Sequence, residues 1–363
     1  MSERLLVATR KGLFELRGAG AALEITGRWF LGEPVTAVLR DPRDGAIYAA
    51  LDLGHFGAKL HRSDDDGATW REVAVPSFAG VPSPGRDADP PPALSMIWTL
   101  EADPAATAGG GLWAGVIPGG LFGSVDKGES WTLNRGLWDQ PMRAEWFGGG
   151  FDQPGVHSIS FDPRDGRKVA VGVSCGGAWL SDDGGETWRV SIAGMWADYL
   201  PPQERENPAT QDPHRIVRCA AAPDVLWTQH HNGVFRSVDA GLSWREIAIA
   251  PSSFGFAVAV HPRDPDTAWF APATSDQQRY PVDGRFILTR TRDGGASFER
   301  LTAGLPDHES YDLVWRHALD VDDTGDRLAV GSTTGSLWVS DDAGDRWTCV
   351  NAHLPPIAAV RWI

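Results

Sequence analysis

The stretch SDDGGETW, residues 181–188, places two aspartates before two glycines and ends on a tryptophan. Aspartate side chains accept hydrogen bonds from nearby backbone N–H groups, and glycine adopts positive φ without steric cost, so the stretch predicts a tight turn. The pattern Ser/Thr-x-Asp-x-Gly-x-x-Trp/Phe occurs six times, starting at residues 63, 124, 181, 237, 291 and 340. Such regular recurrence, at intervals of 49 to 61 residues, is typical of a repeat architecture.

Each copy of the turn follows the same kind of sequence. A short apolar run opened by glycine precedes it, as in GGAWLS (176–181) and GSLWVS (335–340), and β-branched runs with turns such as DPRDG (162–166) come before that. Short runs of this type, bounded by Gly, Pro and Asp, predict strands and turns. We therefore predict four antiparallel strands per repeat, with the aspartate turn between the third and fourth. Repeats of this kind indicate an all-β fold, a β-propeller that spans residues 1–363 as a single domain.

The two ends of the sequence determine the predicted number of blades. The segment LLVATRKGLFEL (5–16) predicts the second and third strands of a further repeat, while PPIAAVRWI (355–363) matches a first strand. We predict that residues 357–363 pair with residues 4–30 in one composite blade, which removes an open sheet edge. This gives seven blades, and six blades is the alternative.

Composition narrows the classes of partner. The net charge of −15 argues against nucleic acid or an anionic membrane surface as the main partner. No stretch approaches the ~20 apolar residues of a membrane span, and the N-terminal residues do not resemble a secretory signal. Cys175, Cys219 and Cys349 are too far apart to predict a disulfide framework or a zinc site. These features predict a cytoplasmic protein.

The six turns resemble the Asp-box, or BNR repeat, of sialidase-like β-propellers, and the resemblance extends over nearly the whole chain. The segments ATRKGLF (8–14) and EWFGGGFDQPGVHSISFDPRDG (145–166) are similar to bacterial members of this group. The motif is also found in xyloglucan-cleaving hydrolases, sortilin-type receptors and a plant photosystem II assembly factor, so it indicates a fold rather than an activity. The resemblance implies structural roles, remote from any active site, for Asp65, Asp126, Asp183, Asp239, Asp293 and Asp342.

Strand order predicts which end of the blades carries function. In a blade with strands A to D, the A–B and C–D turns share one end, and the B–C loops and D-to-A connections share the other. The long connections 76–94, 133–156 and 192–214 and the B–C loop 273–285 all fall at this second end. Since binding residues concentrate on long irregular loops, we predict a ligand site at that mouth of the central channel.

Basic, aromatic and histidine residues supply the candidate contacts at this mouth. Arg10 and Lys11 could hold a carboxylate or phosphate group of a ligand. Imidazole and carboxylate groups suit divalent metals, so His157, His231 and His317 are candidate ligands of a divalent metal in the channel, with solvated histidines as the alternative. The full set of candidate ligand-binding residues is Arg10, Lys11, His55, Trp98, His157, His230, His231 and His317.

The resemblance to sialidases does not extend to their chemistry. Sialidases use an arginine triad, a Tyr–Glu nucleophile pair and an acidic proton donor on six blades, with an Arg-Ile-Pro element that this chain lacks. Hydrolysis of other glycosidic bonds requires two carboxyl groups that face each other across a substrate groove. Candidate catalytic residues are Glu145, Asp152, Glu309 and Tyr311.

The leading hypothesis is a propeller that binds a small-molecule or carbohydrate-like ligand, with glycoside hydrolysis as one form of it. A non-catalytic binding or assembly propeller is the first alternative. A metal-dependent lyase or lactonase-like hydrolase is the second. The sequence leaves open whether the chain is an enzyme.

Overall fold

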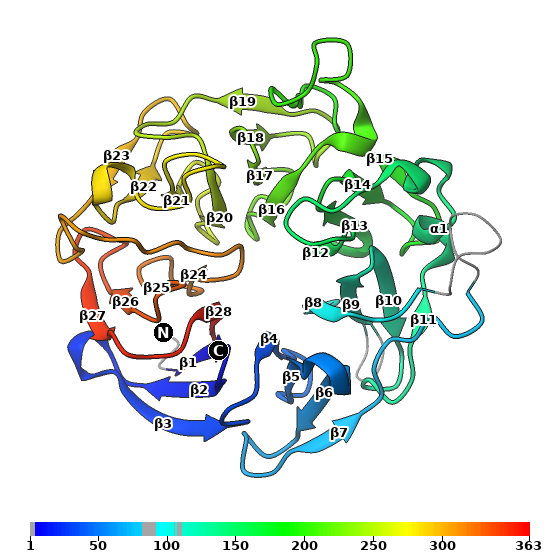
Figure 1. Cartoon of the computed structure of the whole chain (residues 1–363), viewed down its shortest axis with the longest axis horizontal. Coiled ribbons are helices and arrows are strands. Elements are labelled where there is room, and N and C mark those ends of the chain that lie inside the picture. Colours follow the sequence, from blue (N-terminus) through cyan, green and yellow to red (C-terminus); the bar gives the residue numbers. More distant parts are fainter. Residues whose placement is uncertain (1–3, 82–91, 105, 107–110) are drawn as a thin grey trace. The chain divides into compact units, whose positions relative to one another are not determined.

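The computed structural model describes residues 4–81, 92–104, 106 and 111–363. The chain is a seven-bladed β-propeller in which each blade is a four-stranded antiparallel sheet, as the sequence predicts (Figure 1). The helices of the described residues are short: α1 (Arg135–Trp138) and the 3-10 segments η1 (Gly20–Ala22), η2 (Gly54–Phe56), η3 (Pro141–Glu145), η4 (Pro208–Thr210) and η5 (Val282–Gly284). Over the same residues, no helix is long and apolar enough to cross a membrane.

The chain divides into two compact units, which we describe separately. The middle unit comprises Thr36–Pro213, and the terminal unit comprises Met1–Val35 with His214–Ile363. The three sheets of the middle unit are β4 (Val35–Arg40), β5 (Ile47–Asp52), β6 (Ala58–Ser63) and β7 (Arg71–Val73); β8 (Met96–Ala102), β9 (Leu112–Ile117), β10 (Gly120–Ser124) and β11 (Thr132–Leu133); and β12 (Val156–Asp162), β13 (Asp165–Val173), β14 (Gly177–Ser181) and β15 (Arg189–Val190).

The terminal unit holds the other four sheets, one of which combines both ends of the chain. They are β28 (Ile357–Trp362), β1 (Arg4–Thr9), β2 (Gly12–Arg17) and β3 (Glu24–Trp29); β16 (Pro213–Arg218), β17 (Leu226–His230), β18 (Val234–Ser237) and β19 (Arg245–Ile247); β20 (Gly255–Val260), β21 (Ala268–Pro272), β22 (Leu288–Thr291) and β23 (Glu299–Leu301); and β24 (Leu319–Val321), β25 (Leu328–Gly331), β26 (Leu337–Ser340) and β27 (Thr348–Asn351).

The predicted composite blade is confirmed. Strand β28 pairs antiparallel with β1, and Leu5 lies opposite Trp362 while Val7 lies opposite Val360. The last backbone N–H, of Ile363, donates to the carbonyl of Arg4 at 3.0 Å. The edge that β1 would otherwise expose is therefore covered by the C-terminal strand.

The six repeated turns, which we call the Asp–Gly turns, each join the third and fourth strands of a sheet. In residues 181–188, the N–H of Gly185 donates to Ser181 Oγ at 2.8 Å, and the N–H of Thr187 donates to Asp183 Oδ1 at 2.9 Å. In the other five turns, the backbone N–H of the residue four positions after the aspartate likewise donates to the aspartate Oδ1. These aspartates are Asp65, Asp126, Asp239, Asp293 and Asp342. Each aspartate thus satisfies backbone donors that a tight turn leaves unpaired.

An aromatic side chain from the preceding sheet contacts several of these turns. Tyr48 on β5 donates its hydroxyl to the carbonyl of Lys127 at 3.0 Å, one residue before the turn glycine. At the equivalent place in the terminal unit, Trp269 on β21 donates Nε1–H to the carbonyl of Ala343 at 2.9 Å. The Asp–Gly turn is therefore also a surface on which the neighbouring sheet of the same unit packs.

The turn glycine makes room for this aromatic contact. Gly185 has φ of 92°, and a Cβ there would lie 2.8 Å from the Trp113 ring on β9. The last residue of the same turn, Trp188, is buried and lies edge-on to Trp113 with ring centroids 6.5 Å apart. Its Nε1–H donates to the carbonyl of Gly185 at 3.0 Å and to Asn134 Oδ1 at 3.0 Å. In this copy, the trailing tryptophan packs between two sheets as the sequence predicts.

The contact between Trp269 and the next turn predicts a large stability effect. Trp269 is fully buried, so Trp269→Ala removes a large apolar contact and a hydrogen bond, and should lower the free energy of unfolding by about 3–5 kcal/mol. Urea unfolding followed by tryptophan fluorescence and circular dichroism measures the change. The control Val238→Ala, at an exposed residue of another Asp–Gly turn, should unfold within about 0.5 kcal/mol of the wild type.

Acid should weaken the Asp–Gly turns. Hydrogen bonds from the Thr187 and Ser297 hydroxyls, and from the backbone N–H groups of the same residues, lower the pKa of Asp183 and Asp293 to about 2. An unfolded aspartate has a pKa of about 3.9, so each carboxylate contributes stability above about pH 4 that is lost as the pH falls through about 2. The melting-temperature difference between wild type and Asp183→Ala should therefore be constant above pH 5 and shrink toward pH 2. A difference that stays the same at every pH would contradict this cause.

Candidate functional site

The exposed aromatic residues lie at one end of the sheets. We call this the loop end, where the first strand of each sheet begins and where the second and third strands are joined. The connections 133–156 and 192–214 and the loop 273–285 are at this end, as predicted, whereas residues 82–91 of the predicted connection 76–94 lie outside the described residues. Within the described ranges, the large exposed aromatics are Phe56, Phe147, Phe151, Tyr199 and Tyr311, all at loop ends.

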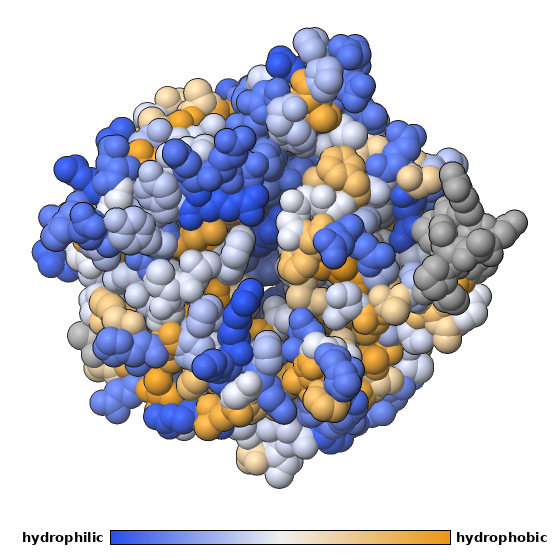
Figure 2. Space-filling view, viewed as in Figure 1, coloured by the Kyte–Doolittle hydropathy of each residue, from blue (hydrophilic) through white to orange (hydrophobic). Residues whose placement is uncertain are grey.

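Hydrophobic residues are also visible on the surface as separate groups among hydrophilic ones (Figure 2). At the other end of the sheets, the Asp–Gly turns expose Val125, Val238 and Leu242, which are aliphatic. Exposed aromatic rings offer flat apolar contact surfaces to ligands, and tyrosine adds a hydroxyl group. Their concentration at the loop ends supports the prediction that ligand contacts gather there.

In the terminal unit, two histidines and two phenylalanines form a histidine–aromatic cluster: His214, His231, Phe254 and Phe256. His214 is the second residue of β16 and stacks on Phe256 of β20, with ring centroids 4.5 Å apart. His231 follows β17 and meets His214 edge-on at 5.3 Å and Phe254 at 5.6 Å. His214 and the two phenylalanines are buried, while the His231 side chain is 20% exposed. The cluster therefore joins the loop ends of two adjacent sheets and reaches solvent through His231.

Charged side chains surround this cluster. The guanidinium carbons of Arg279 and Arg316 lie 5.5 Å and 5.3 Å from the Phe256 ring centroid, within cation–π range. Asp276 forms an ion pair with Arg279, and its Oδ2 lies 3.8 Å from Nε2 of His231. The loop end of this unit thus combines imidazole, guanidinium, carboxylate and aromatic groups.

Two tyrosines extend the same region toward solvent. The rings of Tyr280 and Tyr311 are 6.2 Å apart, and Tyr311 is 62% exposed. The Tyr311 hydroxyl donates to Glu309 Oε2 at 3.0 Å, and this hydrogen bond, together with the carboxylate charge, raises the pKa of Tyr311. Glu309 and Tyr311, both predicted as catalytic candidates, are thus hydrogen-bonded to each other.

In the middle unit, two of the predicted ligand-binding residues lie together. Trp98 on β8 meets His157 on β12 edge-on at 5.4 Å, and it meets the exposed Phe151 at 5.1 Å. His157 is fully buried, and its Nδ1 is 2.9 Å from Ser158 Oγ. The predicted catalytic carboxylates Glu145 and Asp152 are exposed on the connection 133–156.

The remaining predicted contacts differ in exposure. His55 is exposed beside Phe56, and Arg10 and Lys11 are exposed between β1 and β2. His230 is fully buried against Phe235, whereas His317 is half-buried and its carbonyl accepts from the N–H of Val360 at 2.9 Å. Ligand-binding roles for these residues stay predictions.

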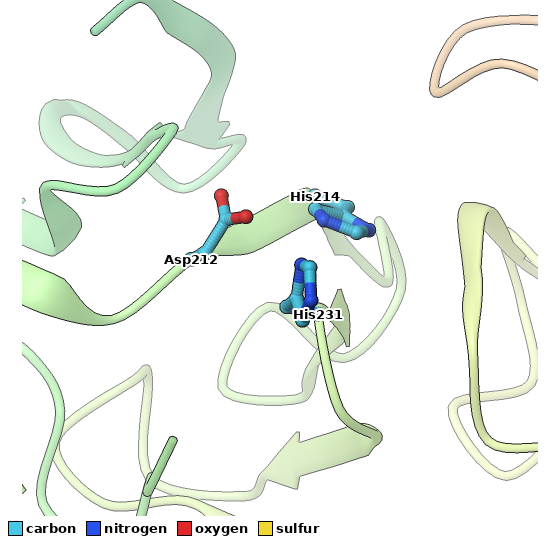
Figure 3. A group of neighbouring side chains, drawn as sticks. All are labelled: Asp212, His214 and His231. Atoms are coloured by element: carbon cyan, nitrogen blue, oxygen red, sulfur yellow. The ribbon is translucent and has the colours of Figure 1, made fainter. Parts of the chain in front are cut away.

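One group of side chains within the described ranges has the composition of a metal centre: Asp212, His214 and His231 (Figure 3). Of the three histidines predicted as metal ligands, His231 belongs to this group, and His157 and His317 do not. Asp212 and His214 were not predicted as ligands, although His214 is the second residue of a first strand, as His157 is. The sequence feature that indicates these two residues is the segment QDPH (211–214), which places an aspartate and a histidine together at the end of a long connection.

Comparison with known proteins gives distant likenesses. No family model matches the chain. A xyloglucanase of Hypocrea jecorina is 25% identical over 248 residues, covering 61% of this chain and 28% of the relative. A probable oligoxyloglucan-reducing end-specific xyloglucanase of Neosartorya fischeri is 23% identical over 354 residues, covering 88% of this chain and 39% of the relative. The chain therefore spans less than half the length of these curated relatives.

Solved structures with the same fold include enzymes and other proteins. An ancestral GH74 enzyme has a TM-score of 0.60 at 17% identity, over 86% of this chain and 38% of that one. YCF48 bound to D1 peptide has a TM-score of 0.55 at 13% identity, over 94% of this chain and 90% of that one. YCF48 from Cyanidioschyzon merolae has a TM-score of 0.55 at 13% identity, over 89% and 87%. These likenesses support a β-propeller, and the closer resemblance to sialidase-like proteins stays a prediction.

The histidine–aromatic cluster predicts one tautomer for His214. Its Nδ1 lies 2.6 Å from the carbonyl oxygen of Gly255, and a carbonyl can only accept, so Nδ1 carries the proton. Long-range ¹H–¹⁵N correlation spectra of the neutral ring should show a protonated Nδ1 and an unprotonated Nε2. The exposed His55 is the control and should show a mixture of tautomers. A proton on Nε2 of neutral His214 would contradict the arrangement.

Proposed function

We propose that this chain is a carbohydrate-binding propeller whose ligand packs on Tyr280 and Tyr311 at the loop end of the terminal unit. The observation that carries the proposal is the pair itself: the rings of Tyr280 and Tyr311 lie 6.2 Å apart, and Tyr311 is 62% exposed at the loop end. A pyranose ring presents apolar C–H faces and polar hydroxyl edges. Aromatic rings pack against the faces, and charged side chains form hydrogen bonds with the hydroxyl groups.

The tyrosine pair has both kinds of partner within the same two loops. Glu309 and Arg279 flank the rings in sequence, and the Glu309 carboxylate is held beside the Tyr311 hydroxyl. Two contacts position Arg279: its guanidinium group lies over the Phe256 ring, and it forms an ion pair with Asp276. Charged groups held in this way form strong, directional hydrogen bonds to a ligand.

The two loops that carry this region are tied together through the backbone. The N–H of Ser310 donates to the carbonyl of Gly284 at 2.9 Å, and the N–H of Phe286 donates to the carbonyl of Pro306 at 2.9 Å. Loops fixed before the ligand arrives lose less entropy on binding. The aromatic surface is therefore preorganised even though it lies on irregular segments.

The relatives suggest the first ligands to test. Both curated relatives are named for action on xyloglucan, so oligosaccharides of this neutral polysaccharide are the first probes. The chain covers only 28% and 39% of those relatives. Their names therefore indicate which ligands to test first, and they do not define the activity of this chain.

Glycoside hydrolysis is the second candidate function, favoured by the Glu309–Tyr311 hydrogen bond. A carboxylate that accepts the phenol proton can act as the base for a tyrosine nucleophile. Glu309 has φ of 49°, in the left-handed region that non-glycine residues seldom adopt. The surrounding loop holds this conformation, since the N–H of the next residue, Ser310, donates to the carbonyl of Gly284 at 2.9 Å.

Binding to the tyrosine pair is testable by titration calorimetry with xyloglucan oligosaccharides. Tyr311→Ala should weaken binding by about tenfold or more, equivalent to about 1.4 kcal/mol, because it removes the exposed ring. Leu242→Ala, at an exposed residue of an Asp–Gly turn, is the matched control and should bind as the wild type does. Equal affinity in the two variants would place the ligand elsewhere.

Hydrolysis is tested separately, by the release of reducing ends from the same oligosaccharides. Tyr311→Phe keeps the ring and removes the hydroxyl, so binding should stay within about threefold, below 1 kcal/mol, while turnover by a Tyr311 nucleophile should be lost. A wild-type chain that binds and does not hydrolyse is the non-catalytic binding propeller. Turnover that survives in Tyr311→Phe would rule out this nucleophile.

A further inference from the structure

Asp212, His214 and His231 bring three metal-ligand side chains together at the loop end of one sheet (Figure 3). One ligand atom from each residue lies within 4.8 Å of the others. Asp212 and His214 are buried, and His231 is half-buried. From this arrangement we propose that the three residues bind a divalent transition-metal ion, through side chains other than the Tyr280 and Tyr311 of the proposed carbohydrate surface.

The chain itself places these three residues. Asp212 directly precedes Pro213, the first residue of β16, and His214 is the second residue of that strand. A single residue separates Asp212 from His214, so the short chain segment keeps the carboxylate near the first imidazole. His231 directly follows β17, the strand that neighbours β16 in the sheet. The site therefore belongs to the loop end of a single sheet.

The first imidazole is oriented for metal binding. His214 donates Nδ1–H to the carbonyl of Gly255 at 2.6 Å, which leaves the lone pair on Nε2. Metal-binding histidines commonly donate their second ring N–H to a carbonyl or carboxylate, because this bond fixes the tautomer and the ring orientation. Stacking on Phe256 further restricts rotation of the ring.

The other two residues also have polar neighbours. Asp276 Oδ2 lies 3.8 Å from Nε2 of His231, which makes it a charged neighbour of the ring rather than a hydrogen-bonded partner. Asp212 Oδ1 accepts from the N–H of Cys175 at 3.1 Å and from Ser174 Oγ at 3.3 Å. Hydrogen-bonded outer partners, which His214 and Asp212 have, commonly accompany metal ligands and orient them.

The ligand set defines the class of metal. Two imidazoles and one carboxylate suit zinc and iron(II), and sites with three protein ligands keep coordination positions for water or substrate. Calcium and magnesium prefer sites made of oxygen ligands, so they do not fit two histidines. The net charge of −15 also favours the approach of a cation.

The proposal is tested with the full chain, stripped with EDTA and titrated with Co²⁺ as a spectroscopic stand-in for zinc or iron(II). We expect one equivalent of Co²⁺ with visible absorption bands that Zn²⁺ displaces. His231→Ala should weaken Co²⁺ affinity by at least about 100-fold, and Asp276→Asn by about tenfold, because the second variant removes only a charged neighbour of the ring. His308→Ala, at an exposed loop-end histidine, should bind as the wild type does.

Two results would overturn the proposal. One is the absence of stoichiometric Co²⁺ binding in the wild type, and the other is equal affinity in His231→Ala and His308→Ala. Because His214 also packs in the cluster, His214→Ala could fail to fold, so His231→Ala is the deciding variant and circular dichroism checks its fold. The readout is metal binding alone, so it stands whether or not the chain binds carbohydrate.

Discussion

The contact between an aromatic side chain and an Asp–Gly turn is the interaction on which the packing of neighbouring sheets depends. Aspartate and glycine hold the turn in a conformation that presents a backbone carbonyl and no side chain at the point of contact. Tyr48 and Trp269 then donate to that carbonyl from the second strand of the preceding sheet. One short motif therefore joins the last two strands of its own sheet and provides the surface on which a neighbouring sheet packs.

This use of the Asp–Gly turns leaves the opposite end of the sheets to other roles. Long connections do not disturb packing there, and that end carries the exposed aromatics of the described residues. The same sheet-to-sheet packing also builds the candidate sites, since His214 from one sheet is held by the Gly255 carbonyl and the Phe256 ring of the next. The proposed carbohydrate surface on Tyr280 and Tyr311 and the proposed metal site on His214 and His231 thus rely on the same sheet-to-sheet packing.

The repeats predicted the architecture closely because each strand and turn is a local pattern. Four strands per sheet, the position of the Asp–Gly turns and the pairing of residues 357–363 with the N-terminal strands all follow from spacing. Side-chain direction was harder to predict. His230 and His231 are adjacent, but His230 is the last residue of β17 and is buried against Phe235, while His231 lies beyond the strand end and reaches the loop end.

By itself, the sequence determined the seven-bladed fold and the end of the sheets at which to look for function, because both depend on period and turn chemistry. Glu309 and Tyr311 could also be singled out, since residues two apart on a loop can meet. Only the tertiary structure decided that His214 meets Phe256 and His231, and that Arg279 and Arg316 lie over the same ring. Those contacts join residues from different strands and sheets. Their distances depend on how the sheets pack, and the spacing of residues along the chain does not predict that packing.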